Sequence, residues 1–180
     1  MAKPKVASDW LAGCAGCHMS LLDIDERIIK LAELVDLRAT PVTDLKEPDE
    51  SGVTVGILED AANNTANEEV AHKMRKRSKI LVGMGDCAVF GGVPAMRNMC
   101  GIREALTRAY VETESTDSQG AIPTDPELAV PTNVRALNEV VPVDVYIPGC
   151  PPDADTIFHV LSALAEGKIP ELKDEYLHWH

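Results

Sequence analysis

The sequence predicts an α/β fold in which helices cover both faces of a doubly wound parallel sheet, in a single domain spanning residues 1–180. Two observations predict it. Short apolar segments alternate along the chain with segments of helical periodicity, as in parallel sheets built with crossover helices. The chain has 180 residues, 45% of them hydrophobic, which suffices for one full core, and it shows no internal repeat or linker.

Three segments of the amino-terminal half are apolar runs of strand length, the second of them weak: residues 5–12, 34–40 and 53–60. From Ser20 to Val35, apolar residues recur at steps of three and four, which predicts one face of a helix. Ser20 and Asp23 have the form of a capping box at its start. Residues 65–76 predict a polar helix, whose basic run at 72–77 is interpreted as a solvated face.

Two further apolar runs predict strands in the carboxyl-terminal half: residues 78–86 and 142–148. Pro94 fits the first turn of a helix that continues through residues 95–111. Residues 112–134 have the composition of a long irregular loop, and Asp153 is placed to cap a last helix over residues 154–167. Together these elements favour a flavodoxin-like arrangement of the strands.

The charge balance limits the classes of partner. The formal net charge is −12, which argues against nucleic acid or an anionic membrane surface. No apolar run approaches the roughly 20 residues that cross a bilayer, and the amino terminus lacks a secretion signal. We therefore expect a cytoplasmic protein, whose five cysteines are more often ligands, reactive groups or core residues than disulfides.

Four of the five cysteines follow predicted strands. Cys14 and Cys17 come after the first strand, and Cys87 and Cys150 come after the last two. The carboxyl ends of parallel strands meet at one edge of a sheet, where ligands bind. Glycine or proline lies close to each of these cysteines, which allows the backbone to approach a bulky cofactor. The helix expected from Ser20 would direct its positive end at an anionic group there.

Three kinds of site are consistent with the Cys-x-x-Cys pair. A redox dithiol would use only Cys14 and Cys17, which leaves Cys87 and Cys150 without a role. Structural zinc usually joins two close-spaced pairs. Here one close pair accompanies two distant single cysteines, a pattern closer to that of a four-iron, four-sulfur cluster. The spacing favours the cluster and is compatible with zinc as well.

Other residues near these motifs are interpreted as structural. Cys100 falls inside the helix expected at 95–111 and is read as a small buried side chain. His18 could line the cofactor site, although an ordinary loop histidine is the favoured interpretation. For Trp10 and Phe90, core packing is favoured in the same way.

Three segments resemble the small subunit of nickel–iron hydrogenases: CAGCHMSLLDIDE (14–26), GDCAVFGGVPAMRN (85–98) and PGCPP (148–152). The resemblance covers most of the chain and is greatest to the cytoplasmic, NAD-reducing (bidirectional) hydrogenases. It implies a flavodoxin-like fold and one 4Fe-4S cluster held by Cys14, Cys17, Cys87 and Cys150, with no role for Cys100. Because no cysteine follows Cys150, this cluster is expected to be the only one in the chain.

The resemblance also implies that this chain is one subunit of a larger enzyme. The nickel–iron centre is expected on a large subunit, because the family builds it from two Cys-x-x-Cys pairs and this chain has one. Electrons from hydrogen would pass through this chain to diaphorase subunits that carry further iron–sulfur clusters, FMN and NAD. No catalytic acid, base or nucleophile is expected here. The loop after the first strand lacks the hydroxyl-rich phosphate loop of flavodoxins, which speaks against a second flavin.

Two rival readings remain at the level of sequence. One is the cluster subunit of NADH:quinone oxidoreductases. A resemblance to that family would lead us to expect adjacent cysteines in the first motif, whereas here Ala15 and Gly16 separate Cys14 from Cys17. The other is a zinc-stabilised binding module with no redox role. Metal and labile-sulfide contents distinguish the zinc module from both cluster proteins.

Overall fold

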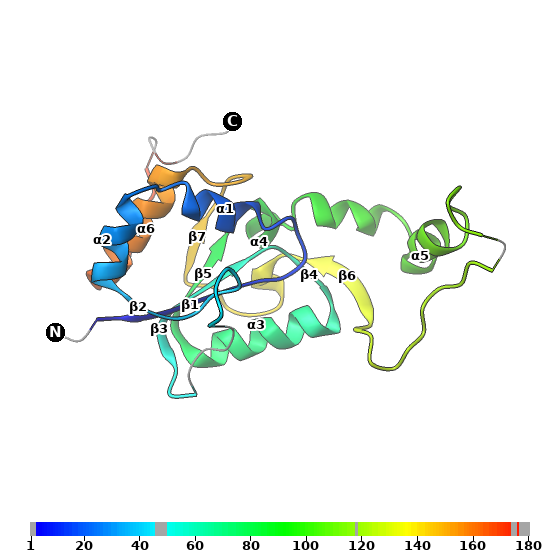
Figure 1. Cartoon of the computed structure of the whole chain (residues 1–180), viewed down its shortest axis with the longest axis horizontal. Coiled ribbons are helices and arrows are strands. Elements are labelled where there is room, and N and C mark those ends of the chain that lie inside the picture. The colour runs from blue at the N-terminus through cyan, green and yellow to red at the C-terminus, as the bar shows by residue number, and fades with distance from the viewer. Residues whose placement is uncertain (1–2, 46–49, 118, 174–175, 177–180) are drawn as a thin grey trace.

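The structure is a computed structural model that describes residues 3–45, 50–117, 119–173 and 176 (Figure 1). Its centre is a sheet of five strands: β1 (Lys5–Trp10), β2 (Asp36–Ala39), β3 (Val53–Glu59), β5 (Ser78–Met84) and β7 (Val145–Ile147). All neighbouring strands are parallel, and their order is β2-β1-β3-β5-β7. This is the flavodoxin-like order, in which the first strand lies between the second and the third. The predicted fold class is confirmed.

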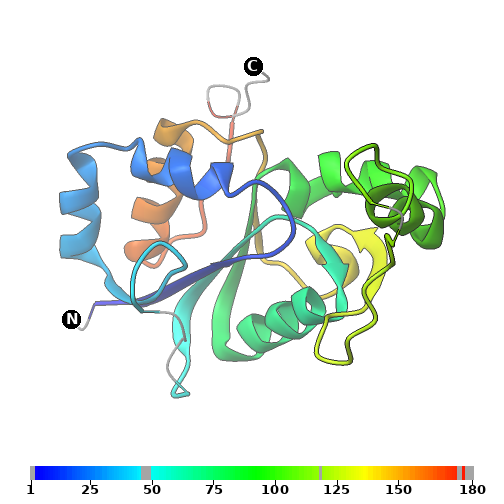
Figure 2. The same cartoon turned by 45° about the vertical axis from the view of Figure 1, so that its right-hand side comes forward.

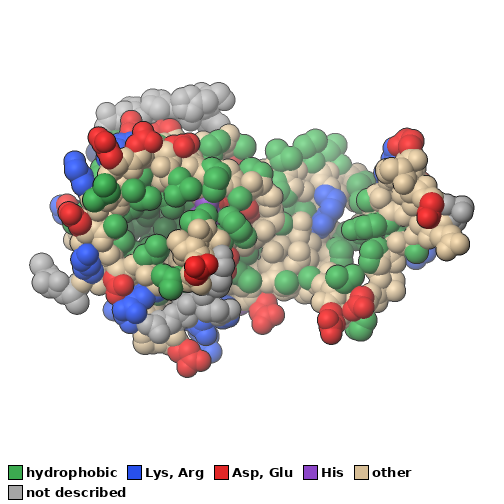
Figure 3. Space-filling view, in the orientation of Figure 1, with side chains coloured by type: hydrophobic (Ala, Val, Ile, Leu, Met, Phe, Trp, Pro, Cys, Tyr) green, Lys and Arg blue, Asp and Glu red, His purple; other side chains and the backbone are tan. Residues whose placement is uncertain are grey.

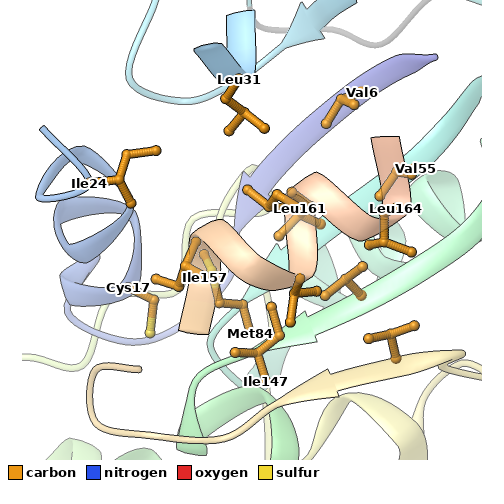
Figure 4. Close-up of a cluster of buried hydrophobic side chains, with 14 residues drawn as sticks. Val6, Cys17, Ile24, Leu31, Val55, Met84, Ile147, Ile157, Leu161 and Leu164 are labelled. Atoms are coloured by element: carbon orange, nitrogen blue, oxygen red, sulfur yellow. The ribbon is translucent and has the colours of Figure 1, made fainter. Parts of the chain in front are cut away.

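Helices cover both faces of the sheet. One face carries α1 (Gly16–Leu22), α2 (Arg27–Leu34) and α6 (Ala154–Ala165), and the other carries α3 (Thr65–Arg77) and α4 (Asp86–Phe90). Because successive side chains of a strand point to opposite faces of the sheet, adjacent residues of one strand pack in different hydrophobic cores. Ile57 belongs to the cluster under α2 and α6, whereas Leu58 belongs to the cluster under α3. Figure 4 shows the first cluster, with Cys17 at its edge beside Ile157.

A second, smaller sheet lies beside the first. It pairs β4 (Ala62–Asn64) with β6 (Pro131–Arg135) in antiparallel fashion. The 3-10 helix η1 (Val93–Met99) packs on it, because the Arg97 guanidinium donates to the carbonyls of Asn63 and Thr132. Another short 3-10 helix, η2 (Leu137–Glu139), follows β6.

Residues 100–117 and 119–130, which we call the arm, project from the body of the molecule (Figures 1 and 2). The arm contains α5 (Ile102–Tyr110), none of whose residues is buried. It returns to the body where Thr65 and Val130 exchange hydrogen bonds of 3.0 and 3.1 Å. The expected loop at 112–134 is irregular except for β6 at its end.

The helix expected over residues 20–35 is two helices. Asp25, in the left-handed region at φ 56°, lies in the turn between α1 and α2. The predicted cap at Ser20 is wrong, because the helix begins at Gly16 and the Ser20 hydroxyl donates instead to the Pro152 carbonyl at 2.5 Å. The helix expected at 95–111 is likewise divided, into η1 and α5, by extended backbone at Cys100 and Gly101. No helix in the described part of the chain is long and apolar enough to cross a membrane.

Candidate cofactor site

Four cysteines lie at the carboxyl-terminal edge of the sheet, where the strand scheme predicted them. Cys14 follows β1, and Cys17 lies in the first turn of α1. Cys87 lies in α4 directly after β5, and Cys150 follows β7. Cys17 is buried, Cys87 is half-buried and the other two are exposed, so the group is open to solvent on one side.

Hydrogen bonds join the loops that follow β5 and β7. The N–H of Gly85 donates to the carbonyl of Ile147 at 2.7 Å, and the N–H of Asp86 donates to the carbonyl of Gly149 at 2.9 Å. The Asp86 carboxylate in turn accepts the N–H of Gly149 at 2.7 Å. Two cysteine-bearing loops that are distant in the sequence are therefore fixed relative to one another.

Glycine backbone lies against two of the thiols. A Cβ atom on Gly92 would lie 2.8 Å from the Cys87 Sγ. A Cβ atom on Gly85 would collide with the Cys17 Sγ, and the φ of +87° at Gly85 also favours glycine. The glycines at positions 85 and 92 therefore make space for the sulfur atoms of Cys17 and Cys87.

The thiols influence one another electrostatically. Burial raises the pKa of Cys17 far above its usual value, and nearby carboxylates, Cys87 and Cys14 raise it further. Burial likewise raises the pKa of Cys87 to about 11, and a nearby carboxylate, Cys150 and Cys14 act in the same direction. Both thiols therefore keep their protons at neutral pH unless a cation compensates the thiolate charge, as bound metal does.

The donor set is compatible with an iron–sulfur cluster and with a single metal ion. Four cysteines can hold a four-iron, four-sulfur cluster or one zinc ion, and zinc needs every sulfur about 2.3 Å from one point. Within the four described ranges, no three Cys, His, Asp or Glu side chains form a group that could hold one metal ion.

A buried carboxylate supports the turn that carries Cys17. Glu59, the last residue of β3, and His18 are both fully buried, and the Glu59 carboxylate pairs with the His18 Nδ1. The same carboxylate accepts the backbone N–H of His18 at 2.7 Å and that of Cys17 at 3.3 Å. These N–H groups of the first turn of α1 therefore point to Glu59, which fixes Cys17 relative to the sheet.

His18 extends this polar chain into the core. Its Nε2 lies 2.9 Å from the Ser8 Oγ, and the Ser8 hydroxyl donates to the Thr40 Oγ1 at 2.9 Å. The Trp10 ring contacts the His18 ring edge-on, with 5.6 Å between the ring centroids. The interpretation of His18 as a loop histidine is wrong, because it is a buried residue of α1. A usable signal was Glu59, a carboxylate at the end of an apolar strand that requires a buried partner.

Asp60 is a second buried carboxylate beside the cysteines. Its side chain accepts backbone hydrogen bonds from Cys14 and Ala15, and its φ of 75° is in the left-handed region. Burial and the charge of Glu59 raise the pKa of Asp60 to about 6, against the opposing effects of His18 and these hydrogen bonds. Asp60 therefore ties the loop after β1 to the end of β3.

Three other sequence interpretations can be compared with the structure. Cys100 is exposed between η1 and α5, with its Sγ 3.5 Å from the Arg97 carbonyl, so the expected burial is wrong. Phe90 does not pack in the core either, since 61% of its surface is exposed. Trp10 is partly exposed and contacts the His18 ring.

Replacing Gly85 with alanine is expected to disturb the Cys17 side of the site. The new Cβ would collide with the Cys17 Sγ and would also occupy an unfavourable φ. Gly167→Ala is the matched control, because its φ is +76° but nothing lies within 4 Å of the added Cβ. Urea unfolding should show a cost of about 1–2 kcal/mol for the control, from φ alone, and a larger cost for Gly85→Ala. Equal costs for the two variants would contradict the collision.

Known proteins resemble this chain over nearly its whole length. The family model described as NADH ubiquinone oxidoreductase, 20 kDa subunit, matches residues 14–164. The NAD-reducing hydrogenase HoxS subunit delta of Cupriavidus necator is 40% identical over 92% of this chain and 80% of its own. A subunit of the F420-non-reducing hydrogenase of Methanothermobacter thermautotrophicus is 36% identical over 97% of this chain and 58% of its own. The chain thus spans only a little over half of the latter relative.

Solved structures show the same architecture. A chain of an NAD+-reducing [NiFe]-hydrogenase in the H2-reduced state superposes with a TM-score of 0.94 and 37% identity, over 99% of this chain and 100% of that one. A [NiFeSe]-hydrogenase chain from Dm. baculatum superposes with a TM-score of 0.62 at 19% identity, over 98% of this chain and 69% of that one, which shows a shared fold.

Proposed function

This chain belongs to the family of the NADH ubiquinone oxidoreductase 20 kDa subunit and is homologous to the small subunit of NAD-reducing [NiFe]-hydrogenase, and we propose that it is the electron-transfer subunit of such an enzyme. It would hold one 4Fe-4S cluster next to a large subunit that splits hydrogen. Electrons would leave toward diaphorase subunits that carry further iron–sulfur clusters, FMN and NAD. The assembly is proposed to work in the cytoplasm.

The gathering of Cys14, Cys17, Cys87 and Cys150 at one sheet edge is the observation that carries this proposal. A bound cluster would supply one-electron transfer. The cysteines would hold it as thiolates, while Glu59 holds the backbone of the Cys17 turn. Apolar residues beneath Cys17 would exclude water from its inner side, and the low polarity there would tune the reduction potential.

An exposed apolar ridge next to the cysteines supports a large-subunit partner. It consists of Phe90, Val93, Met96 and Met99, of which every member is at least 61% exposed. The ridge follows Cys87 directly and continues along η1. Contiguous exposed apolar side chains beside a functional site are typical of subunit interfaces, so we place the large-subunit contact here.

The proposal is tested by anaerobic purification of the complex through a tag on this chain, followed by an assay of hydrogen-dependent NAD reduction. We expect a co-purifying chain with two Cys-x-x-Cys pairs, and NADH formation that depends on hydrogen. Iron and labile sulfide should be present in this chain. Zinc without labile sulfide would contradict the cluster, and a quinone-reducing assembly without a nickel-binding chain would favour the rival oxidoreductase reading.

Replacing Met96 with glutamate is expected to weaken assembly, because a charge would be buried in the proposed contact. Ile29→Glu is the matched control, since Ile29 on α2 is 62% exposed and Met96 is 63% exposed. Recovery of the large subunit in the tagged pull-down should fall at least tenfold for Met96→Glu and remain unchanged for Ile29→Glu. Equal recovery for the two variants would show that the ridge is not part of the interface with the large subunit.

A further inference from the structure

A cavity extends from the surface into the core between α2, α6 and the first strands of the sheet. Its volume is about 190 Å³, and its walls are apolar, with Val6, Leu31, Val55 and Leu164 among them. In Figure 3 it is visible as a hollow on the N-terminal side of the molecule, surrounded by hydrophobic side chains. An apolar space of this size at the surface can take up a small apolar molecule.

Two buried hydroxyl groups interrupt the apolar wall. Ser8 and Thr40 both line the cavity, and only 4% and 3% of their surfaces are exposed. They are hydrogen-bonded to one another at 2.9 Å, and Ser8 also meets the His18 ring. Each hydroxyl has one donor and two acceptor sites, so this pair retains capacity for a hydrogen bond to a further group.

The mouth of the cavity is open and apolar. Leu22, Ile28, Leu37 and Val42 line the cavity and are also exposed to solvent, each with more than a third of its surface accessible. An apolar molecule would therefore reach the interior without displacing a charged side chain. The ring of exposed side chains would lose its contact with water when the space is filled.

We propose that this cavity binds a small monocyclic compound that is apolar over most of its surface and carries one hydroxyl or carbonyl group. An apolar cavity of about 150 Å³ in another protein binds benzene, so this one accommodates a six-membered ring with a polar substituent. The apolar walls would hold the ring, and the Ser8–Thr40 pair would bind the polar group and fix its orientation. The proposed electron-transfer function does not require this site.

Two fluorinated probes test the proposal on the purified, intact complex by fluorine NMR. Fluorobenzene matches the ring alone, and 4-fluorophenol adds a hydroxyl that can donate or accept. We expect saturable binding of both, with 4-fluorophenol about tenfold tighter, the factor that one net hydrogen bond gives. Failure of both probes to bind would overturn the site, and equal affinities would overturn the role of the hydroxyl pair.

Three variants locate the binding. Thr40→Val keeps the shape of the side chain and should remove the preference for 4-fluorophenol while fluorobenzene still binds. Ala165→Leu should abolish the binding of both probes, because Ala165 lines the cavity and the larger side chain would fill it. Ala163→Leu on the same helix is the control, since Ala163 lines a different hollow. Undiminished binding to the Ala165 variant would place the probes elsewhere and refute the proposal.

Discussion

Cys87→Ala is expected to remove the 4Fe-4S cluster and, with it, hydrogen-dependent NAD reduction. Cys87 interacts electrostatically with Cys14, Cys17 and Cys150. Its loss takes away one of the four ligands of the proposed set. In the anaerobically purified complex, iron and labile sulfide should fall by about four of each per copy of this chain, while the clusters of the partner subunits remain, and hydrogen-dependent NADH formation should fall to the assay background.

Cys100→Ala is the control for this experiment. Cys100 is exposed and its sulfur contacts the Arg97 carbonyl, so its replacement should leave the cluster and the activity unchanged. Cys150→Ala should behave like Cys87→Ala. A cluster that survives the loss of Cys87 but not of Cys100 would refute the ligand assignment.

Glu59→Ala is expected to destabilise the chain by about 3–5 kcal/mol, because three buried donors lose their acceptor and each unsatisfied group costs about 1–3 kcal/mol. Both side chains of the pair are fully buried. The substitution leaves His18 without its charged partner and the N–H groups of Cys17 and His18 without their acceptor. The free energy of unfolding in urea measures this cost. Glu59→Gln should cost less, because an amide oxygen can still accept one of these hydrogen bonds.

An exposed ion pair provides the comparison for Glu59. Arg27 and Asp155 are joined at 2.6 Å, with 75% of the Asp155 side chain exposed. Asp155→Asn should change the free energy of unfolding by less than about 1 kcal/mol, as is typical of surface pairs. Similar costs at Glu59 and Asp155 would show that the buried network contributes little to stability.

The sheet could be predicted from the sequence because its strands are short apolar runs, most of which are separated by segments of helical periodicity. That alternation also placed Cys14, Cys17, Cys87 and Cys150 at one edge, since each follows a parallel strand. The strand β4 was missed because three residues, Ala62–Asn64, carry too little pattern to distinguish them from a turn. Whether the four cysteines are the cluster ligands stays a prediction.

The interior of the site was harder to predict than its position. His18 and Glu59 are 41 residues apart, and nothing in the local sequence around either residue indicates that the two are paired. Their pairing depends on how the first turn of α1 sits on the end of β3, which is a tertiary feature. The break at Asp25 was invisible for a related reason, because a hydrophobic periodicity can continue across a turn that divides one helix into two.

The arm affects how readily the unassembled chain is degraded by proteases. Since α5 buries none of its residues, the isolated chain gains little free energy that would offset the conformational entropy lost in ordering the arm. Segments of this kind open readily and are preferred sites of proteolytic cleavage. Newly made chains that fail to assemble would therefore be cleaved first within the arm, so that the arm determines the lifetime of the unassembled protein.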